Sequence, residues 1–348
     1  MKILLVKISA LGDGLDTTPF PRLLRRHGHT VDLLTSNTCL PLWVNNPYLS
    51  GLYSVKLSRL LSVRDTILNL YSILKLFASA ATNPYQLVFI LHCSDQLRLF
   101  AQILFPFTRI YSMSHSKSGS SVLKYRTDKN RTVQESLLFR LAGLAVEQPH
   151  SLEFYPRETL HNYHALCGKN LSAFKIISLA VGGGNVLSSA TTRRLPANLI
   201  VDLISASDPQ WHFLLLGHGL DDSDQASFIL SRLSTNQRSK LSSLVNLTSI
   251  HEAYSLISAS NFFLGGDTGL SKLAAASGTP TLILFGPTSP LLASPLGSNV
   301  SSIQTNSSCN TCYLPSDGLN SPMYHCIDPI CMNHDIQRIA HFISSSIG

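Results

Sequence analysis

Short apolar runs of strand length alternate with longer stretches of helical periodicity along almost the whole chain. In the first half, the runs over residues 3–8, 30–35 and 86–92 are separated by helical patterns, and the alternation restarts at residues 175–181. A strand that is followed by a helix returns to a parallel neighbour, so this order predicts parallel sheets with helices on both faces. The sequence therefore predicts an α/β protein made of Rossmann-like, doubly wound domains.

The chain has 348 residues, which is more than one small core accommodates and predicts two domains. The stretch over 146–173 contains two prolines and little periodicity, as is typical of a linker. We therefore expect an N-terminal Rossmann-like domain over 1–160 and a C-terminal one over 161–348. In such sheets ligands bind outside the carboxyl ends of the strands, so the cleft between the domains is the expected site.

Positive charge is concentrated in the first half. Residues 1–170 carry 19 Lys or Arg against 10 Asp or Glu, whereas residues 171–348 carry 8 against 10. This asymmetry predicts an anionic partner for the first domain, such as a phosphorylated glycan, a phospholipid or a nucleic acid. Lys117, Lys124 and Arg126 are the candidate contacts. The basic stretch over 109–131 has only Tyr111 and Tyr125 as aromatics, which disfavours nucleic-acid binding.

No apolar run approaches the roughly 18 residues that cross a bilayer, and the apolar start over residues 1–6 is too short for a signal peptide. We expect a cytoplasmic protein, in which thiols stay reduced. Cys39, Cys93 and Cys167 are isolated and fit buried, unreactive thiols. The remaining cysteines are close enough in sequence to form a structural zinc site: Cys309, Cys312, Cys326 and Cys331.

A candidate general base follows the first expected strand. The segment after that strand reads Ser9-Ala-Leu-Gly12-Asp13-Gly, where Gly12 permits a tight turn. Asp13 would then lie at the carboxyl end of the strand, where a carboxylate can accept a proton. The alternative interpretation makes Asp13 the N-cap of a helix that begins near Asp16.

Two glycine-rich turns in the second half are candidate phosphate sites. Gly182-Gly-Gly184 follows an expected strand, and Arg193 lies further along the same loop, where a guanidinium could pair with a diphosphate. Residues 265–270 lead from a strand into a helix, whose free N–H groups favour an anion. Asp267 in this turn is either an orienting residue or a plain N-cap.

Taken together, these segments resemble glycosyltransferase family 9, the ADP-heptose:lipopolysaccharide heptosyltransferases. Residues 2–13 with Thr17-Thr18-Pro19 resemble the N-terminal signature of the family, and residues 265–276 resemble its donor-site signature. Residues 285–288, Phe-Gly-Pro-Thr, match the next block, and the cysteine-rich tail also occurs in many members. The resemblance spans nearly the whole chain and rests on the order and spacing of the motifs as well as on residue type.

The resemblance implies a GT-B fold with an acceptor-binding first domain and a nucleotide-sugar-binding second domain. It implies an inverting transfer that needs no metal, from ADP-heptose to the lipopolysaccharide inner core, with a Kdo or heptose acceptor. That acceptor belongs to a membrane glycolipid, which implies peripheral association with the inner membrane. Asp13 matches the proposed base, and Arg193 would neutralise the leaving diphosphate. The positions that match donor contacts are Ser9, Gly12, Arg193, Asp222, Asp267, Thr268, Gly269 and Lys272.

Three positions depart from the family pattern. Lys272 stands where the family has His, Leu195 replaces Trp, and Asp16 occupies a position that is usually apolar. These changes leave two other functions open: a GT-B transferase that uses a different nucleotide-sugar donor, and a non-catalytic glycan-binding scaffold of the same fold.

Overall fold

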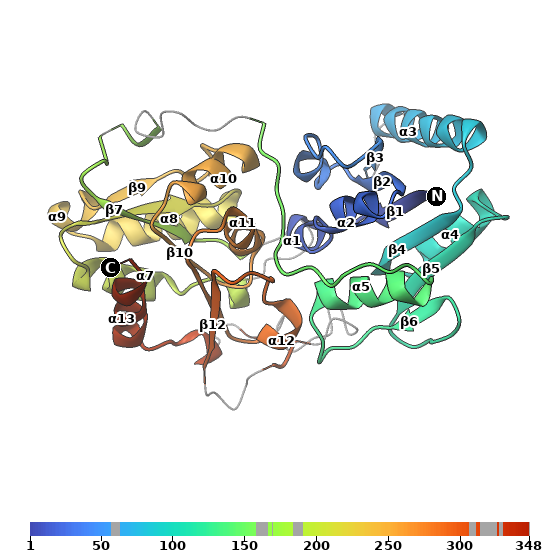
Figure 1. Ribbon diagram of the computed structural model, residues 1–348. Helices are drawn as coiled ribbons and strands as arrows, with labels where there is room; N and C mark the ends of the chain where they lie inside the picture. Colours follow the sequence, from blue (N-terminus) through green and yellow to red (C-terminus); the bar gives the residue numbers. More distant parts are fainter. Residues whose placement is uncertain are drawn as a thin grey trace. The chain divides into compact units, whose positions relative to one another are not determined.

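The computed structural model describes residues 1–56, 63–157, 166–168, 170–183, 191–305, 311–313, 326 and 330–347. The chain divides into two compact units, Met1–Tyr155 and Pro156–Gly348 (Figure 1). Each unit contains a six-stranded sheet whose paired strands are all parallel. The predicted α/β class and the Rossmann-like architecture of both halves are thereby confirmed.

The sheet of the first unit has the order β3-β2-β1-β4-β5-β6, which is a doubly wound arrangement. Its central strands β1 and β4 are almost fully buried apolar runs, because helices cover both faces of the sheet. The strands are β1 (Lys2–Lys7), β2 (Thr30–Ser36), β3 (Gly51–Val55), β4 (Leu87–Cys93), β5 (Arg109–Ser114) and β6 (Val122–Lys124).

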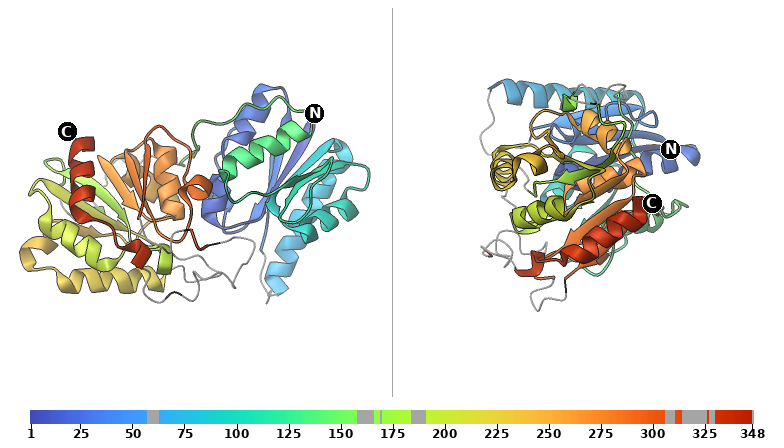
Figure 2. Two further views of the ribbon diagram at one scale, coloured as in Figure 1. Left: turned by 90° about the horizontal axis from the view of Figure 1, so that it is seen from below. Right: turned by 90° about the vertical axis from the view of Figure 1, so that its left-hand side faces the viewer.

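Two helix layers enclose this first sheet. The helices are α1 (Leu11–Leu15), α2 (Phe20–Arg26), α3 (Val63–Thr82), α4 (Asp95–Leu104) and α5 (Arg131–Leu141). On one face, Leu76 of α3 and Ala101 of α4 pack against Val88 of β4 in a common core cluster. On the other face, the ring of Phe139 of α5 lies 4.9 Å from that of Phe20 of α2. The left view of Figure 2 shows α3 and α4 on one side of the sheet and α5 on the other.

The sheet of the second unit has the order β12-β11-β10-β7-β8-β9. Its strands are β7 (Lys175–Ala180), β8 (Trp211–Leu216), β9 (Leu241–Ser243), β10 (Phe262–Gly265), β11 (Thr281–Phe285) and β12 (Val300–Gln304). Its α-helices are α7 (Ala197–Ala206), α8 (Leu220–Arg232), α9 (Thr235–Arg238), α10 (Ile250–Ser258), α11 (Gly269–Ser277), α12 (Pro290–Ala293) and α13 (Ile336–Ile347). The core contains the apolar side chains of β7, β8 and β10 together with those of α7 and α13.

The sequence-based predictions fail at the sheet edges. Strands β3 and β12 were not expected, and β6 lies inside the stretch over 113–131 that lacked a strand pattern. A strand was expected over 244–247, but β9 ends at Ser243. All four are edge strands. They are short or only half buried, so they lack the continuous apolar run that marks a central strand.

Candidate active site

The turn between β10 and α11 presents a helix N-terminus. Thr268 is the N-cap of α11, and its Oγ1 accepts a hydrogen bond from the N–H of Ser271 at 3.3 Å. Ser271 Oγ donates to the carbonyl of Gly266 at 2.6 Å and closes the turn. The interpretation of Asp267 as the N-cap is therefore wrong, because Thr268 has that role. The N–H groups at the start of α11, beginning at Gly269, form an end that favours a negatively charged group.

The loop that carries Arg193 packs directly on this turn. Arg193 Nη1 lies 3.3 Å from Asp267 Oδ2, and both side chains are largely buried. A Cβ atom on Gly266 would collide with the backbone carbonyl of Arg193, so the close approach of the two loops requires glycine here. Arg193 Nε is buried and has no hydrogen-bond partner among the residues that the structure describes. The Arg193 loop and the turn between β10 and α11 thus form one cluster, in which Arg193 Nε is a donor without a partner among the described residues.

Asp222 lies in the first turn of α8 and is buried against the ends of β7 and β8. Its Oδ2 accepts a hydrogen bond from the N–H of His218 at 2.8 Å. A Cβ on Gly182 or on Gly217 would collide with this carboxylate, so both glycines make room for it. Burial raises the pKa of Asp222 above its ordinary value, and the hydrogen bond from His218 opposes that shift.

Two of the departures from the family pattern are buried in the second unit. Leu195 is fully buried in the core cluster, and its carbonyl accepts a hydrogen bond from Gln225 Nε2 at 2.7 Å. Lys272 lies in the first half of α11 and is only 3% exposed. Its side chain is therefore buried close to the candidate donor turn. Residues 184–190 of the glycine-rich loop, including Gly184, lie outside the described residues.

In the first unit, Asp13 lies within α1 and pairs with the first residue of α5. Arg131 Nη1 donates to Asp13 Oδ1 at 2.7 Å, and Arg131 Nε donates to the hydroxyl of Tyr125 at 3.3 Å. The alternative in which Asp13 caps a helix that begins near Asp16 is wrong, because α1 begins at Leu11 and ends before Asp16. Asp13 is 36% exposed at its side chain, so solvent can reach it.

A buried ion pair anchors the segment that follows α1. Lys7 Nζ lies 2.6 Å from Glu135 Oε1 and donates to the carbonyl of Leu91 at 2.8 Å. Thr17 Oγ1 donates to Glu135 Oε2 at 2.7 Å. Burial lowers the pKa of Lys7, but the attraction of Glu135 and the weaker attraction of Asp13 and Asp16 outweigh it and hold the pKa above its ordinary value. The network joins β1, the α1 region and α5 without using Asp13.

Ser9 and Gly12 belong to the same end of β1. The carbonyl of Ser9 accepts hydrogen bonds from Ser36 Oγ at 2.9 Å and from Cys39 Sγ at 3.0 Å, which hold the chain between β1 and α1. Gly12 lies inside α1. Both residues are in the first unit, whereas the other predicted donor-binding residues are in the second.

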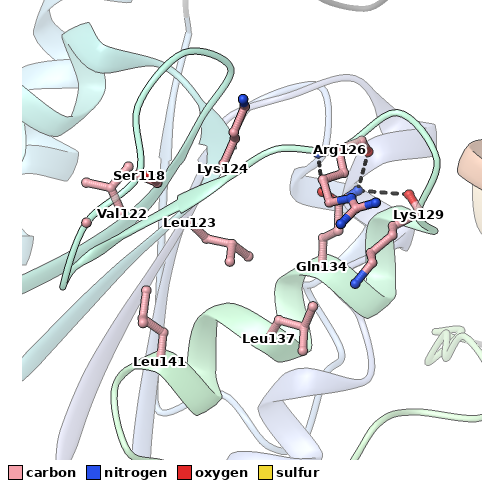
Figure 3. A pocket seen from close by; sticks show the side chains of 10 residues that line it. Ser118, Val122, Leu123, Lys124, Arg126, Lys129, Gln134, Leu137 and Leu141 are labelled. Carbon is pink, nitrogen blue, oxygen red and sulfur yellow. Dashed lines mark hydrogen bonds between the residues drawn. The ribbon is translucent and has the colours of Figure 1, made fainter.

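A pocket of about 470 Å³ lies between β6 and α5 (Figure 3). Leu123, Leu137 and Leu141 line it, together with the polar or charged residues Lys124, Arg126, Lys129 and Gln134. Gln134 is buried; its Oε1 accepts from the N–H of Arg126 at 2.7 Å, and its Nε2 donates to the carbonyls of Arg126 and Lys129 at 2.9 and 2.8 Å. It therefore fixes the basic loop that leads to Arg131.

The predicted acceptor-binding residues are thus only partly brought together. Lys124 and Arg126 line the pocket, whereas Lys117 is not among its lining residues and pairs with Asp95 of α4 at 3.1 Å. Sequence reasoning placed Lys129 in the basic stretch but named neither Lys129 nor Gln134 as a candidate contact. The signal that could have found them is Asn130, a strong N-cap residue, which starts α5 there.

The cysteine prediction lies partly outside the described residues, because Cys309 is among those left undescribed. Cys331 is buried and Cys326 is exposed. Within the described ranges, no group of three or more His, Cys, Asp or Glu side chains could hold a metal ion. In the same ranges, no helix combines the length and apolar character that crossing a bilayer requires.

Comparisons with known proteins agree with the motifs. The family model described as glycosyltransferase family 9 (heptosyltransferase) matches residues 203–318. The chain is 22% identical to lipopolysaccharide heptosyltransferase 3 of Escherichia coli over 303 residues, which cover 83% of this chain and 84% of that protein.

Solved structures share the fold. E. coli ADP-heptose lps heptosyltransferase II matches with a TM-score of 0.74 at 19% identity, over 100% of this chain and 98% of that chain. TibC, an iron-containing dodecameric glycosyltransferase of enterotoxigenic E. coli, matches with a TM-score of 0.57 at 10% identity, over 99% of this chain and 77% of that chain. The matched region, the N-terminal and donor-turn motifs and the two-sheet architecture together make the chain similar to members of glycosyltransferase family 9, the heptosyltransferase family.

Proposed function

We propose that this protein is an inverting heptosyltransferase that moves heptose from ADP-heptose to a lipopolysaccharide inner-core acceptor, without a catalytic metal. The observation that carries the proposal is the Arg193–Asp267 cluster at the N-terminus of α11. The names of E. coli ADP-heptose lps heptosyltransferase II and of lipopolysaccharide heptosyltransferase 3 support the donor and the class of acceptor.

On the donor side, the leaving ADP gains negative charge as the glycosidic bond breaks. Arg193 is held by Asp267 through Nη1, and its buried Nε can donate to a diphosphate oxygen. The N–H groups that follow Thr268 supply further donors. Preorganised donors of this kind stabilise developing charge most strongly where water is excluded, and losing one costs about a hundred- to a thousandfold in rate.

On the acceptor side, Asp13 accepts the proton of the attacking hydroxyl, while that oxygen bonds to the anomeric carbon and ADP leaves. Arg131 fixes one carboxylate oxygen of Asp13, so the proton is taken by a base of defined orientation. The loop over 124–131 ends at Arg131 and carries Lys124, Arg126 and Lys129 along the pocket. These cations suit the anionic groups of an inner-core acceptor.

The first test is thermal stabilisation of the full chain by ADP, UDP, GDP and CDP at matched concentrations, with and without added divalent metal. A ligand that binds only the folded state raises the melting temperature. We expect selective stabilisation by ADP without metal, its loss in Arg193→Ala, and its retention in the control Arg232→Ala. Transfer from ADP-heptose to an inner-core acceptor should fail in Asp13→Asn while ADP stabilisation persists.

Two results would overturn the proposal. A preference for another nucleotide would point to a different donor on the same fold. No response to any nucleotide, together with intact glycan binding in Asp13→Asn, would indicate a non-catalytic scaffold.

A further inference from the structure

Exposed apolar side chains gather on two neighbouring helices of the first unit. Among the described residues, five large apolar side chains that stand exposed belong to α3 and three to α4, and one more, Phe107, lies in the turn after α4. Leu99 and Ile103 are 60% and 68% exposed, and Phe107 is completely exposed. We call these nine residues the α3/α4 surface: Ile67, Leu68, Leu70, Tyr71, Leu74, Leu99, Phe100, Ile103 and Phe107.

The same helices also bury apolar side chains on their inner faces. Ile73 and Leu76 of α3 pack in the core of the first unit, as do Leu97 and Ala101 of α4. Positions 67, 71 and 74 share one stripe of a helix, and positions 73 and 76 lie on the opposite side, since residues three or four apart face the same way. Both helices are thus apolar on two faces, and a soluble domain needs only one.

The two helices form a continuous layer. The ring of Phe77 of α3 lies 6.1 Å from that of Phe105, which follows α4, and Leu76 and Ala101 share one core cluster. Figure 2, left, shows α3 and α4 on the same face of the first sheet. Contiguous exposed apolar surface of this kind marks a site of interaction with another molecule or with a membrane.

The charges around the α3/α4 surface favour a lipid bilayer. The acid of each helix is matched by a lysine: Asp65 lies 2.8 Å from Lys56, and Asp95 lies 3.1 Å from Lys117. Lys75 is exposed and lies 4.5 Å from the ring of Tyr71. The wider first half of the chain carries 19 basic against 10 acidic residues. Basic charge around an apolar helix face is what binds the anionic surface of a membrane.

We infer that the α3/α4 surface docks the protein on an anionic lipid bilayer, with the outer faces of both helices lying in the interface. The inference rests on the proposed function in one respect: a glycolipid acceptor would be presented at the surface of the bilayer. The helices lie on the membrane and do not span it, because their inner faces pack in the core of the first unit.

The test is co-sedimentation of the full chain with phosphatidylethanolamine–phosphatidylglycerol vesicles, against phosphatidylcholine vesicles. The variant Leu99→Gln with Ile103→Gln removes exposed apolar groups only, so it should fold normally. The matched control is Leu220→Gln with Leu291→Gln, because these second-unit residues are 83% and 69% exposed. We expect salt-sensitive binding to the anionic vesicles, weakened by about tenfold or more in the α4 variant and unchanged in the control.

Three outcomes would overturn the inference. They are the absence of vesicle binding by the unaltered protein, equal losses in both variants, and a dimer in solution that the α4 variant converts to a monomer. The last would assign the α3/α4 surface to a second copy of the chain. Thermal stabilisation by ADP is measured in parallel: vesicle binding without ADP binding refutes the proposed function alone, and ADP binding without vesicle binding refutes the surface alone.

Discussion

Replacing Glu135 by glutamine tests the buried ion pair that anchors the α1 region. The change keeps the shape of the side chain but removes the charge that lies 2.6 Å from Lys7 Nζ. Breaking a buried pair from one side costs about 3–5 kcal/mol. A second argument gives an upper limit of similar size. If Lys7 becomes neutral in the folded variant, removing its proton at pH 7 from a group with an ordinary pKa of about 10.4 costs about 4.6 kcal/mol, at about 1.36 kcal/mol per pKa unit.

The assay is urea unfolding followed by tryptophan fluorescence. The chain has two tryptophans: Trp43 is buried in the first unit and Trp211 is buried in the second. In a Trp211→Phe background, Trp43 reports the first unit alone. With a urea dependence of about 2 kcal/mol per molar, a loss of about 4 kcal/mol lowers the midpoint by about 2 M in Glu135→Gln.

The pH dependence gives a second readout. In Glu135→Gln the folded-state pKa of Lys7 falls below its unfolded value, so the unfolded chain binds more protons and stability rises with pH. The deficit should therefore shrink between pH 7 and about 9.5. The double variant Lys7→Met with Glu135→Leu should regain most of the stability. A midpoint shift below about 0.5 M for Glu135→Gln, with no pH dependence, would refute a charged pair at this place.

The remaining predictions concern the two candidate sites. Gly266→Ala should cost about 1–3 kcal/mol and abolish stabilisation by ADP, because its Cβ would displace the carbonyl of Arg193; thermal melts with and without ADP measure both effects. ADP affinity should fall on acidification, beginning above the ordinary carboxyl range, because the pKa of Asp222 is raised. Titration calorimetry should show that ADP affinity depends less on pH in Asp222→Asn. An equal pH dependence in the variant and the unaltered protein would contradict a role of Asp222 in ADP binding. Arg131→Gln should lower kcat by about a hundredfold and move its acidic limb to higher pH, because Asp13 loses its adjacent positive charge. Stability should stay unchanged or rise slightly, since a cation at a helix N-terminus is unfavourable.

The pH behaviour expected for Arg131→Gln also depends on the titratable groups that interact with Asp13. Among the described residues these include Lys7, His92, Cys39 and Tyr125, whose pKa values respond to Asp13. Burial lowers the pKa of His92 and raises those of Cys39 and Tyr125. Those three groups are therefore neutral near pH 7, and Arg131 and Lys7 supply the positive charge. A fall in kcat with an unchanged pH profile would indicate that Arg131 only supports the fold.

The central architecture was readable in the sequence because it depends on local pattern. Strands β1, β4, β7 and β8 are buried on both faces and show as mostly apolar runs, and the helices between them carry their own periodicity. The motif around Asp267 was recognisable because a strand, a tight glycine turn and a helix start must follow one another directly. These features determined the fold class and the family.

Only the tertiary structure decided which distant residues meet. Asp13 and Arg131 are 118 positions apart and Arg193 and Asp267 are 74 apart, and no local pattern encodes such distances. The edge strands escaped detection because each has a neighbour on one side only. Such a strand is less buried and needs no continuous apolar run. The apolar periodicity of α3 shows that some face of the helix is buried, but not which apolar residues stay outside. That choice follows from how α3 packs against the sheet, above all against β3, and it exposes the α3/α4 surface.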